Sequence, residues 1–254
     1  MKRFLWLMMV SVLFVSVKAQ TSLCISTEKT TSLVFPFSIL HVDRGTQSVL
    51  AQPVKESPTI LLVKAASKGF PETNLSVVTE DGSIYSFMVC YDSNPVTWVY
   101  HLPVNKSATL ATYANAIIDN PKTIGGIKDH KWDMQARISG IYIKGDVIYY
   151  QLSLVNQSPV DYDIDLLRFY IRDKKKGKRT AVQENDLKPL YVVGNTSQVK
   201  ANSNSSVVVA LDKFTIPDAK YLAVQVMEKN GGRHLFMKIN NRKIMQAITL
   251  PDLK

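Results

Sequence analysis

Apolar and polar residues alternate with a period of two along much of the chain, which is the pattern of half-buried β-strands. The clearest example lies in residues 60–95. It opens with the apolar run 60–63, which is short enough for a strand buried on both faces. Alternating stretches at 74–79 and 84–91 flank Asp81-Gly82, a strong hairpin signal because glycine reaches positive φ without steric cost. The pattern predicts a three-stranded β unit, and we take as the inward face of its last strand Tyr85, Phe87, Val89 and Tyr91.

Shorter strands are predicted on both sides of this unit, at residues 33–35, 39–42, 47–51 and 96–102. Good helix formers follow one another only in residues 107–118, where Ser107 is a suitable N-cap and Asn120-Pro121 a stop. Residues 123–132 contain Gly125-Gly126, which indicates a linker, and we place the domain boundary there.

The second half of the chain is another series of short strands with polar turns. A hairpin is predicted from residues 137–143 and 147–156, followed by a strand at 162–172. Asn230-Gly231-Gly232 is a hairpin turn between the last two strands. The later strands are expected at residues 180–183, 207–211, 222–228 and 234–239. This spacing is typical of a β-sandwich with immunoglobulin-like proportions.

The predicted fold class is therefore all-β, with two β-sandwich-like domains joined by a linker that carries one short helix. The expected boundaries are a leader at 1–19, an N-terminal β domain at 20–105, the linker with its helix at 106–132, and an immunoglobulin-like domain at 133–254.

The leader has the three parts of a secretory signal peptide. Met1-Lys2-Arg3 is basic, residues 4–17 are apolar, and Val17-Lys18-Ala19 fits the cleavage rule, which places the mature start at Gln20. The apolar run is too short to span a bilayer, since about twenty residues are needed. Leu23 before Cys24 does not suit a lipoprotein signal. We expect an exported chain.

Composition supports a folded protein. The chain has 254 residues, of which 46% are apolar and 20% charged, values ordinary for a globular protein. Loss of Lys2, Arg3 and Lys18 with the leader lowers the formal net charge from +10 to +7. A moderately basic chain favours acidic partners or an anionic membrane surface, and a solvated basic surface explains the charge equally well.

Two cysteines, Cys24 and Cys90, would follow the leader into an environment that permits disulfides. Two readings are open. A disulfide between them would close a long loop, whereas Cys90 as a free thiol would serve as a small core residue on the strand face of Ile84 and Met88. The chain has no Cys-x-x-Cys motif, so the sequence gives no support for a redox or zinc site.

Two charged clusters resemble ligand sites. Asp161, Asp163 and Asp165 mimic the start of a calcium loop, but Leu166 and Arg172 stand where glycine and glutamate are required, so an exposed strand face is the better interpretation. The basic run at 174–179 is a candidate contact for phosphate or an acidic partner, and a solvated hairpin tip is the alternative.

No catalytic, cofactor-binding or metal-binding motif is found. The four histidines are scattered and form no His-x-x-x-His pair, and the sequence lacks a Gly-x-Ser-x-Gly elbow, a phosphate loop and a dinucleotide fingerprint. We therefore expect no cofactor and no enzymatic activity. The histidines are His41, His101, His130 and His234.

The sequence of residues 60–95 contains LLVKA, ETNLSVVT, DG and YSF in this order. It resembles the N-terminal domain of TrbG and CagX proteins, which are outer-ring subunits of type IV secretion systems. Together with GIYIKGDVIYYQLSLVNQSPVDYDIDLLRFYIRDKKKGKRTAVQ, the chain resembles the conjugative-transposon TraN family of Bacteroides-type bacteria. The resemblance spans nearly all of the expected mature chain.

The resemblance implies a structural subunit of a conjugative type IV secretion apparatus that supports DNA transfer. Its expected location is periplasmic, with peripheral association with the outer membrane. Its expected partners are other copies in a ring, a scaffold subunit and a small lipoprotein, without direct nucleic-acid binding. The alternative is an exported immunoglobulin-like binding module or periplasmic chaperone.

Overall fold

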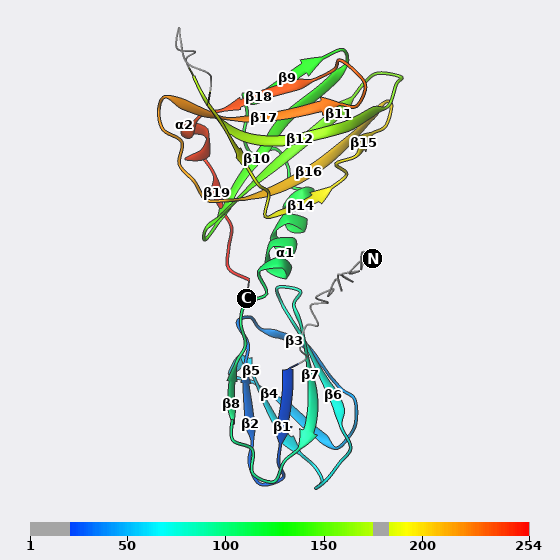
Figure 1. Ribbon diagram of the computed structural model, residues 1–254, viewed down its shortest axis with the longest axis vertical. Coiled ribbons are helices and arrows are strands. Elements are labelled where there is room, and N and C mark those ends of the chain that lie inside the picture. Colours follow the sequence, from blue (N-terminus) through cyan, green and yellow to red (C-terminus); the bar gives the residue numbers. More distant parts are fainter. Residues whose placement is uncertain (1–20, 175–182, 254) are drawn as a thin grey trace, which may run out of the picture. The chain divides into compact units, whose positions relative to one another are not determined.

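The computed structural model describes residues 21–174 and 183–253 (Figure 1). The expected leader, most of the basic run and most of the strand expected at 180–183 lie outside these residues. The described chain divides into two compact units. The first holds the residues up to Val78 together with Ile84–Leu102, and the second holds Thr79–Ser83 and the residues from Pro103 onward. Strands dominate both units, which confirms the all-β prediction.

The first unit is built from two four-stranded sheets (Figure 1). Their inner faces form one core, because in each strand alternate side chains point to the same side. The first sheet has the order β1 (Thr21–Ile25), β7 (Ile84–Tyr91), β6 (Thr73–Thr79), β3 (Ile39–Arg44). The second has the order β4 (Val49–Val54), β5 (Ser57–Ala65), β2 (Thr31–Val34), β8 (Val99–His101).

The period-two pattern assigned the buried face of β7 correctly. Phe87 and Val89 are buried, whereas Ile84 on the opposite face is 66% exposed. The expectation that residues 60–63 are buried on both faces is wrong. In β5 Leu61 and Val63 are buried and their neighbours only partly so, because one face of this sheet meets the core.

The second unit is a sandwich of a six-stranded and a five-stranded sheet (Figure 1). The larger sheet has the order β14 (Tyr191–Gly194), β16 (Ser203–Asp212), β11 (Val147–Asn156), β10 (Met134–Lys144), β19 (Ile248–Thr249), and β9 (Lys128–Lys131) also pairs with β10. The smaller sheet has the order β13 (Glu184–Leu187), β12 (Tyr162–Asp173), β17 (Lys220–Glu228), β18 (Leu235–Ile239), and β15 (Gln198–Val199) also pairs with β12. A short helix, α2 (Asn241–Ile244), follows β18.

Helix α1 (Lys106–Ile118) covers the outer face of the larger sheet. Its buried side chains pack against a cluster on β10, β11 and β16 that includes Tyr149 and Val208. Gln151 on β11 donates from Nε2 to three carbonyl oxygens at the end of the helix, at distances of 2.8–3.3 Å. The N-cap is Asn105, whose side chain accepts from the backbone of Ala108, and not the expected Ser107.

The residues expected to form a linker, 106–132, belong to the second unit. α1 packs on the sandwich and β9 extends the sheet through β10, so both elements gain their stability from the C-terminal core. After β8 the chain passes from the first unit to the second between Leu102 and Pro103.

Candidate functional site

The two candidate cysteines lie opposite each other. β1 pairs in parallel with β7, and in this register Cys24 is the partner of Cys90, with their Cα atoms 4.8 Å apart. The two residues form a disulfide within the first unit. The bond joins an edge strand to the middle of its sheet.

The three spaced acids do not converge on a common point. Asp161 accepts from the backbone N–H of Ala201 at 2.7 Å, and Asp163 accepts from the Gln198 side chain at 2.7 Å. All three acids are exposed on β12 or just before it. Within the described residues no group of three His, Cys, Asp or Glu side chains is arranged to hold a metal ion.

The four histidines lie on different elements. The exposed residues among them lie on β3, β8 and β9. His234 is partly buried, and its Nδ1 accepts from the backbone N–H of Glu228 at 3.2 Å. It therefore belongs to the loops at one end of the C-terminal sandwich, where a cluster of polar side chains lies.

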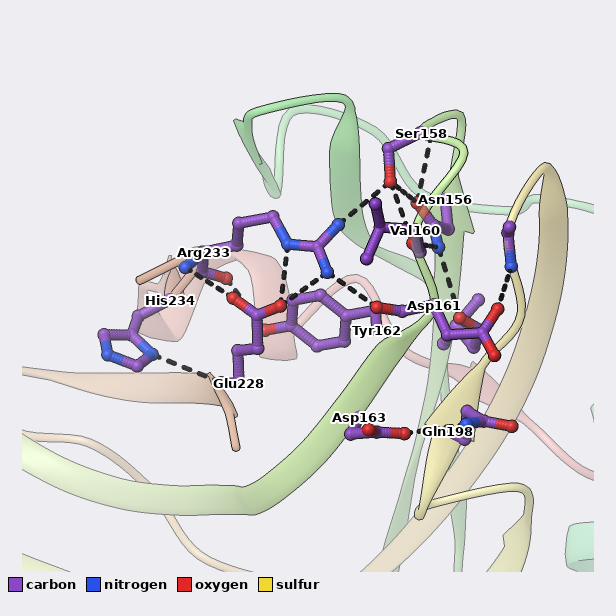
Figure 2. Close-up of polar contacts among 12 residues, drawn as sticks. Asn156, Ser158, Val160, Asp161, Tyr162, Asp163, Gln198, Glu228, Arg233 and His234 are labelled. Carbon is purple, nitrogen blue, oxygen red and sulfur yellow. Dashed lines mark hydrogen bonds and ion pairs between the residues drawn. The ribbon is translucent and has the colours of Figure 1, made fainter. Parts of the chain in front are cut away.

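An ion pair is the centre of this cluster, which we call the loop network (Figure 2). Glu228 is the last residue of β17, and Arg233 follows the turn Asn230-Gly231-Gly232 that leads into β18. Nε of Arg233 donates to Oε1 of Glu228 at 2.8 Å, and its backbone N–H donates to Oε2 at 2.9 Å. The two side chains are only 13% and 11% exposed, so the charges are largely withdrawn from water.

The Arg233 guanidinium also binds the loop between β11 and β12 (Figure 2). Nη1 donates to Oγ of Ser158 at 2.9 Å, and Nη2 donates to the carbonyl oxygen of Asp161 at 2.7 Å. The guanidinium carbon lies 5.1 Å from the centre of the Tyr162 ring, and the Tyr162 hydroxyl donates to the carbonyl oxygen of Arg233 at 2.8 Å. One side chain therefore ties two loops together.

Asn156, the last residue of β11, connects a third loop to the loop network (Figure 2). Its Nδ2 donates to the carbonyl oxygens of Val160, Val199 and Lys200 at 2.8–3.2 Å. Its Oδ1 accepts from the backbone N–H and the hydroxyl of Ser158. The loop after β15 is thereby tied to the loop that Arg233 binds.

The electrostatics agree with a permanent ion pair. Burial acts to raise the pKa of Glu228, but hydrogen bonds from Arg233 and the charges of Arg233 and His234 outweigh it, so this pKa is lowered. Burial, together with the negative charge of Glu228, raises the pKa of Tyr162. Glu228 is thus held ionised and Tyr162 neutral. The network is built to hold three loops in place, since its charged and hydroxyl groups bind one another and the backbone.

A groove of about 410 Å³ lies beside α1 in the second unit. Apolar walls come from Leu110 and Tyr113 of the helix, and from Val147 and Tyr149 of β11. Lys144 at its rim donates to Asp252, and this hydrogen bond is the largest cause that raises the pKa of the ammonium group. Charged side chains also line the groove, among them Lys106, Asp146 and Asp212.

The second unit matches the profile of a known family. The profile of a family described as "Domain of unknown function (DUF4138)" matches residues 107–249, more than half of the chain. The chain belongs to this family. A second profile, "Domain of unknown function (DUF8473)", matches residues 23–95, and a search of curated proteins found no match.

The DUF4138 match begins inside α1 and ends at the last residue of β19. It contains the whole loop network and most of the groove residues. The helix is thus part of the DUF4138 unit in the family comparison as well as in the structure. In the described part of the chain, no helix has the length and apolar character needed to cross a membrane.

Sequence reasoning missed the loop network. Two of its members that bond each other, Ser158 and Arg233, are 75 residues apart in the sequence. In addition, polar residues in turns are ordinarily solvated, so they do not stand out as a site. Two local signals were present. Asn156-Gln157-Ser158-Pro159 is a turn in which the asparagine can bond the following backbone, and Arg233 directly follows two glycines.

Proposed function

We propose that this protein is a structural, non-catalytic subunit of the periplasmic or outer-membrane ring of a conjugative type IV secretion apparatus, and that it is a member of the TraN family. The observation that carries the proposal is the resemblance of residues 60–95 and 140–183 to TraN, TrbG and CagX proteins. The resemblance extends over both compact units and is not confined to one motif.

The chemistry of the described residues supports an architectural role. The most buried ion pair is used to hold loops, and the histidines are scattered over both units. Activity in such a protein would reside in its surfaces, through contacts with other copies, a scaffold subunit and a small lipoprotein.

Exposed sheet edges supply surfaces of the required kind. β14 is an edge strand of the six-stranded sheet, and β3 and β4 are edge strands in the first unit. Leu40 on β3 and Leu50 on β4 are exposed apolar residues. Unpaired strand edges with apolar side chains favour association with other chains.

The proposal is tested by a mating assay. A strain deleted for the gene is complemented with the wild type and with single alanine variants of the four histidines, and DNA transfer and protein amount are measured together. We expect deletion to abolish transfer and the histidine variants to restore it. Full transfer in the deletion strain would refute the conjugation role, and a stable, assembled histidine variant without transfer would refute the non-catalytic role.

Fractionation separates the proposal from the alternative of an exported binding module or chaperone. A ring subunit should sediment with the outer membrane in a large assembly when the neighbouring conjugation genes are expressed. A free binding module should remain in the soluble periplasmic fraction under the same conditions.

A further inference from the structure

One edge of β12 is only partly paired. β15 pairs with Tyr162 and Asp163 at its start, and β13 pairs with it from Phe169 onward. In the pairings of the described residues, no strand covers residues 165–168 on this edge, while β17 covers the opposite one. A strand advances about 3.4 Å per residue, so the gap is about 14 Å long.

A β-bulge marks the start of this gap. The register between β12 and β17 shifts between Ile164 and Leu166, so Asp165 is the extra residue. Bulges bend a strand and re-aim its side chains, and they are frequent at functional edges. Here the bulge places Leu166 at the surface, where it is 41% exposed.

A slot of about 280 Å³ opens beside the gap, between the two sheets of the sandwich. Its floor includes Phe169 and Val209, which are buried core residues. Val192 of β14 is the paired neighbour of Val209 and lines the same slot, yet it is 38% exposed. An apolar side chain on the core side of a strand is therefore left open to water.

The path of the chain explains the opening. After β13 the chain leaves the five-stranded sheet, forms β14 in the other sheet, and returns as β15. Pro189 and Thr196, from the two crossings, line the slot. The position on β12 that a continuous edge strand would occupy is thus left unpaired by the described residues, with β15 and β13 paired on either side of it.

We propose that this unpaired position binds an extended segment of another protein, which pairs with β12 at residues 165–168 and inserts one large apolar side chain into the slot. Alternate residues of a strand point to the same side, so residues two positions before and after the apolar one face the slot rim. The main-chain pairing supplies affinity, and the slot selects the side chain.

The charge of the slot lining indicates which residues should flank the apolar side chain of the bound segment. Asp165 is the charged side chain that lines the slot, and it has no hydrogen bond or ion pair with any described residue. Asp163 precedes it on the same strand, and Asp161 lies just before the strand begins. A segment with lysine or arginine two positions from its apolar anchor would bring opposite charge to Asp165, whereas an acidic segment would be repelled.

The test uses the full chain and a fluorescent, capped peptide, Thr-Lys-Thr-Leu-Thr-Lys-Thr, in a fluorescence-polarisation titration. Three matched peptides carry glutamate in place of both lysines, serine in place of leucine, or N-methylated bonds on both sides of the leucine. We expect saturable binding of the lysine peptide and at least tenfold weaker binding of each of the others.

Two variants test the site. Val192→Trp should fill the slot and weaken binding at least tenfold, with Leu190→Trp, which adds the same bulk beside the α1 groove, as control. Asp165→Lys should reverse the preference between the lysine and glutamate peptides, whereas Asp218→Lys at another exposed position should not. Circular dichroism of each variant checks that it is folded.

Absence of saturable binding, or equal behaviour of Asp165→Lys and Asp218→Lys, would overturn the proposal. So would self-association in sedimentation that Val192→Trp abolishes without any peptide binding, because the occupant would then be a second copy. The inference deepens the proposed function by naming a partner site, but the titration does not involve DNA transfer. Its failure is therefore distinguishable from failure of the mating assay.

Discussion

Replacement of Arg233 by leucine should destabilise the C-terminal unit strongly. The variant removes the side-chain hydrogen bonds from Nε and Nη2 to Oε1 of Glu228, the bond to Ser158 and the bond to the Asp161 carbonyl, and it keeps only the backbone N–H bond to Oε2. It leaves the Glu228 carboxylate, which is 11% exposed, without its cation. Removal of one partner of a buried ion pair costs about 3–5 kcal/mol of stability, mostly because the remaining charge is uncompensated.

The assay is thermal and urea unfolding followed by circular dichroism and by fluorescence of Trp132, which lies in the second unit. For a domain of this size each kcal/mol shifts the midpoint by about 2–4 °C, so the expected loss is about 6–20 °C. The control is Arg168→Leu. Arg168 also binds two acids, but Asp186 is 66% exposed, and such surface pairs contribute about 0–1 kcal/mol.

A double variant and a pH series isolate the cause. Arg233→Leu combined with Glu228→Leu removes the uncompensated charge and should recover part of the loss. The lowered pKa of Glu228 means that its pairing stabilises the fold above the unfolded value, near 4.5, and ceases to do so as pH falls through the folded value. The difference between wild type and Arg233→Leu should therefore shrink as pH is lowered below 4.5. Equal midpoints for Arg233→Leu and Arg168→Leu at pH 7 would refute the reasoning.

Three further predictions concern the core, helix α1 and the disulfide. Phe87→Asp should cost several kcal/mol and prevent accumulation of the protein, whereas Ile84→Asp on the exposed face should be tolerated, as immunoblots of both variants will show. Gln151→Leu leaves the carbonyls at the end of α1 without their donor and should cost about 1–3 kcal/mol in urea unfolding, and an unchanged midpoint would contradict this role of the amide. The double serine variant of Cys24 and Cys90 should lose about 2–5 kcal/mol, and an unchanged urea midpoint for the first unit would contradict a stabilising bond.

The sequence by itself determined the elements that depend on neighbouring residues. Period-two patterns located β6, β7, β10 and β11, and the inward face of β7 follows from alternation alone. Asp81-Gly82 and Asn230-Gly231-Gly232 located turns, and Gly82 and Asn230 adopt the positive φ that such turns require. These features arise from backbone sterics and side-chain direction over a few residues, so no knowledge of the fold was needed.

The tertiary structure decided everything that depends on distant parts of the chain. α1 and β9 were expected in a linker, because a local pattern cannot show that another segment offers a face to cover. The disulfide depends on a parallel register between strands 66 residues apart, and the loop network depends on three loops that meet only when the sandwich closes. The slot beside β12 exists because the chain crosses between the sheets, and topology of that kind leaves no periodic trace in the sequence.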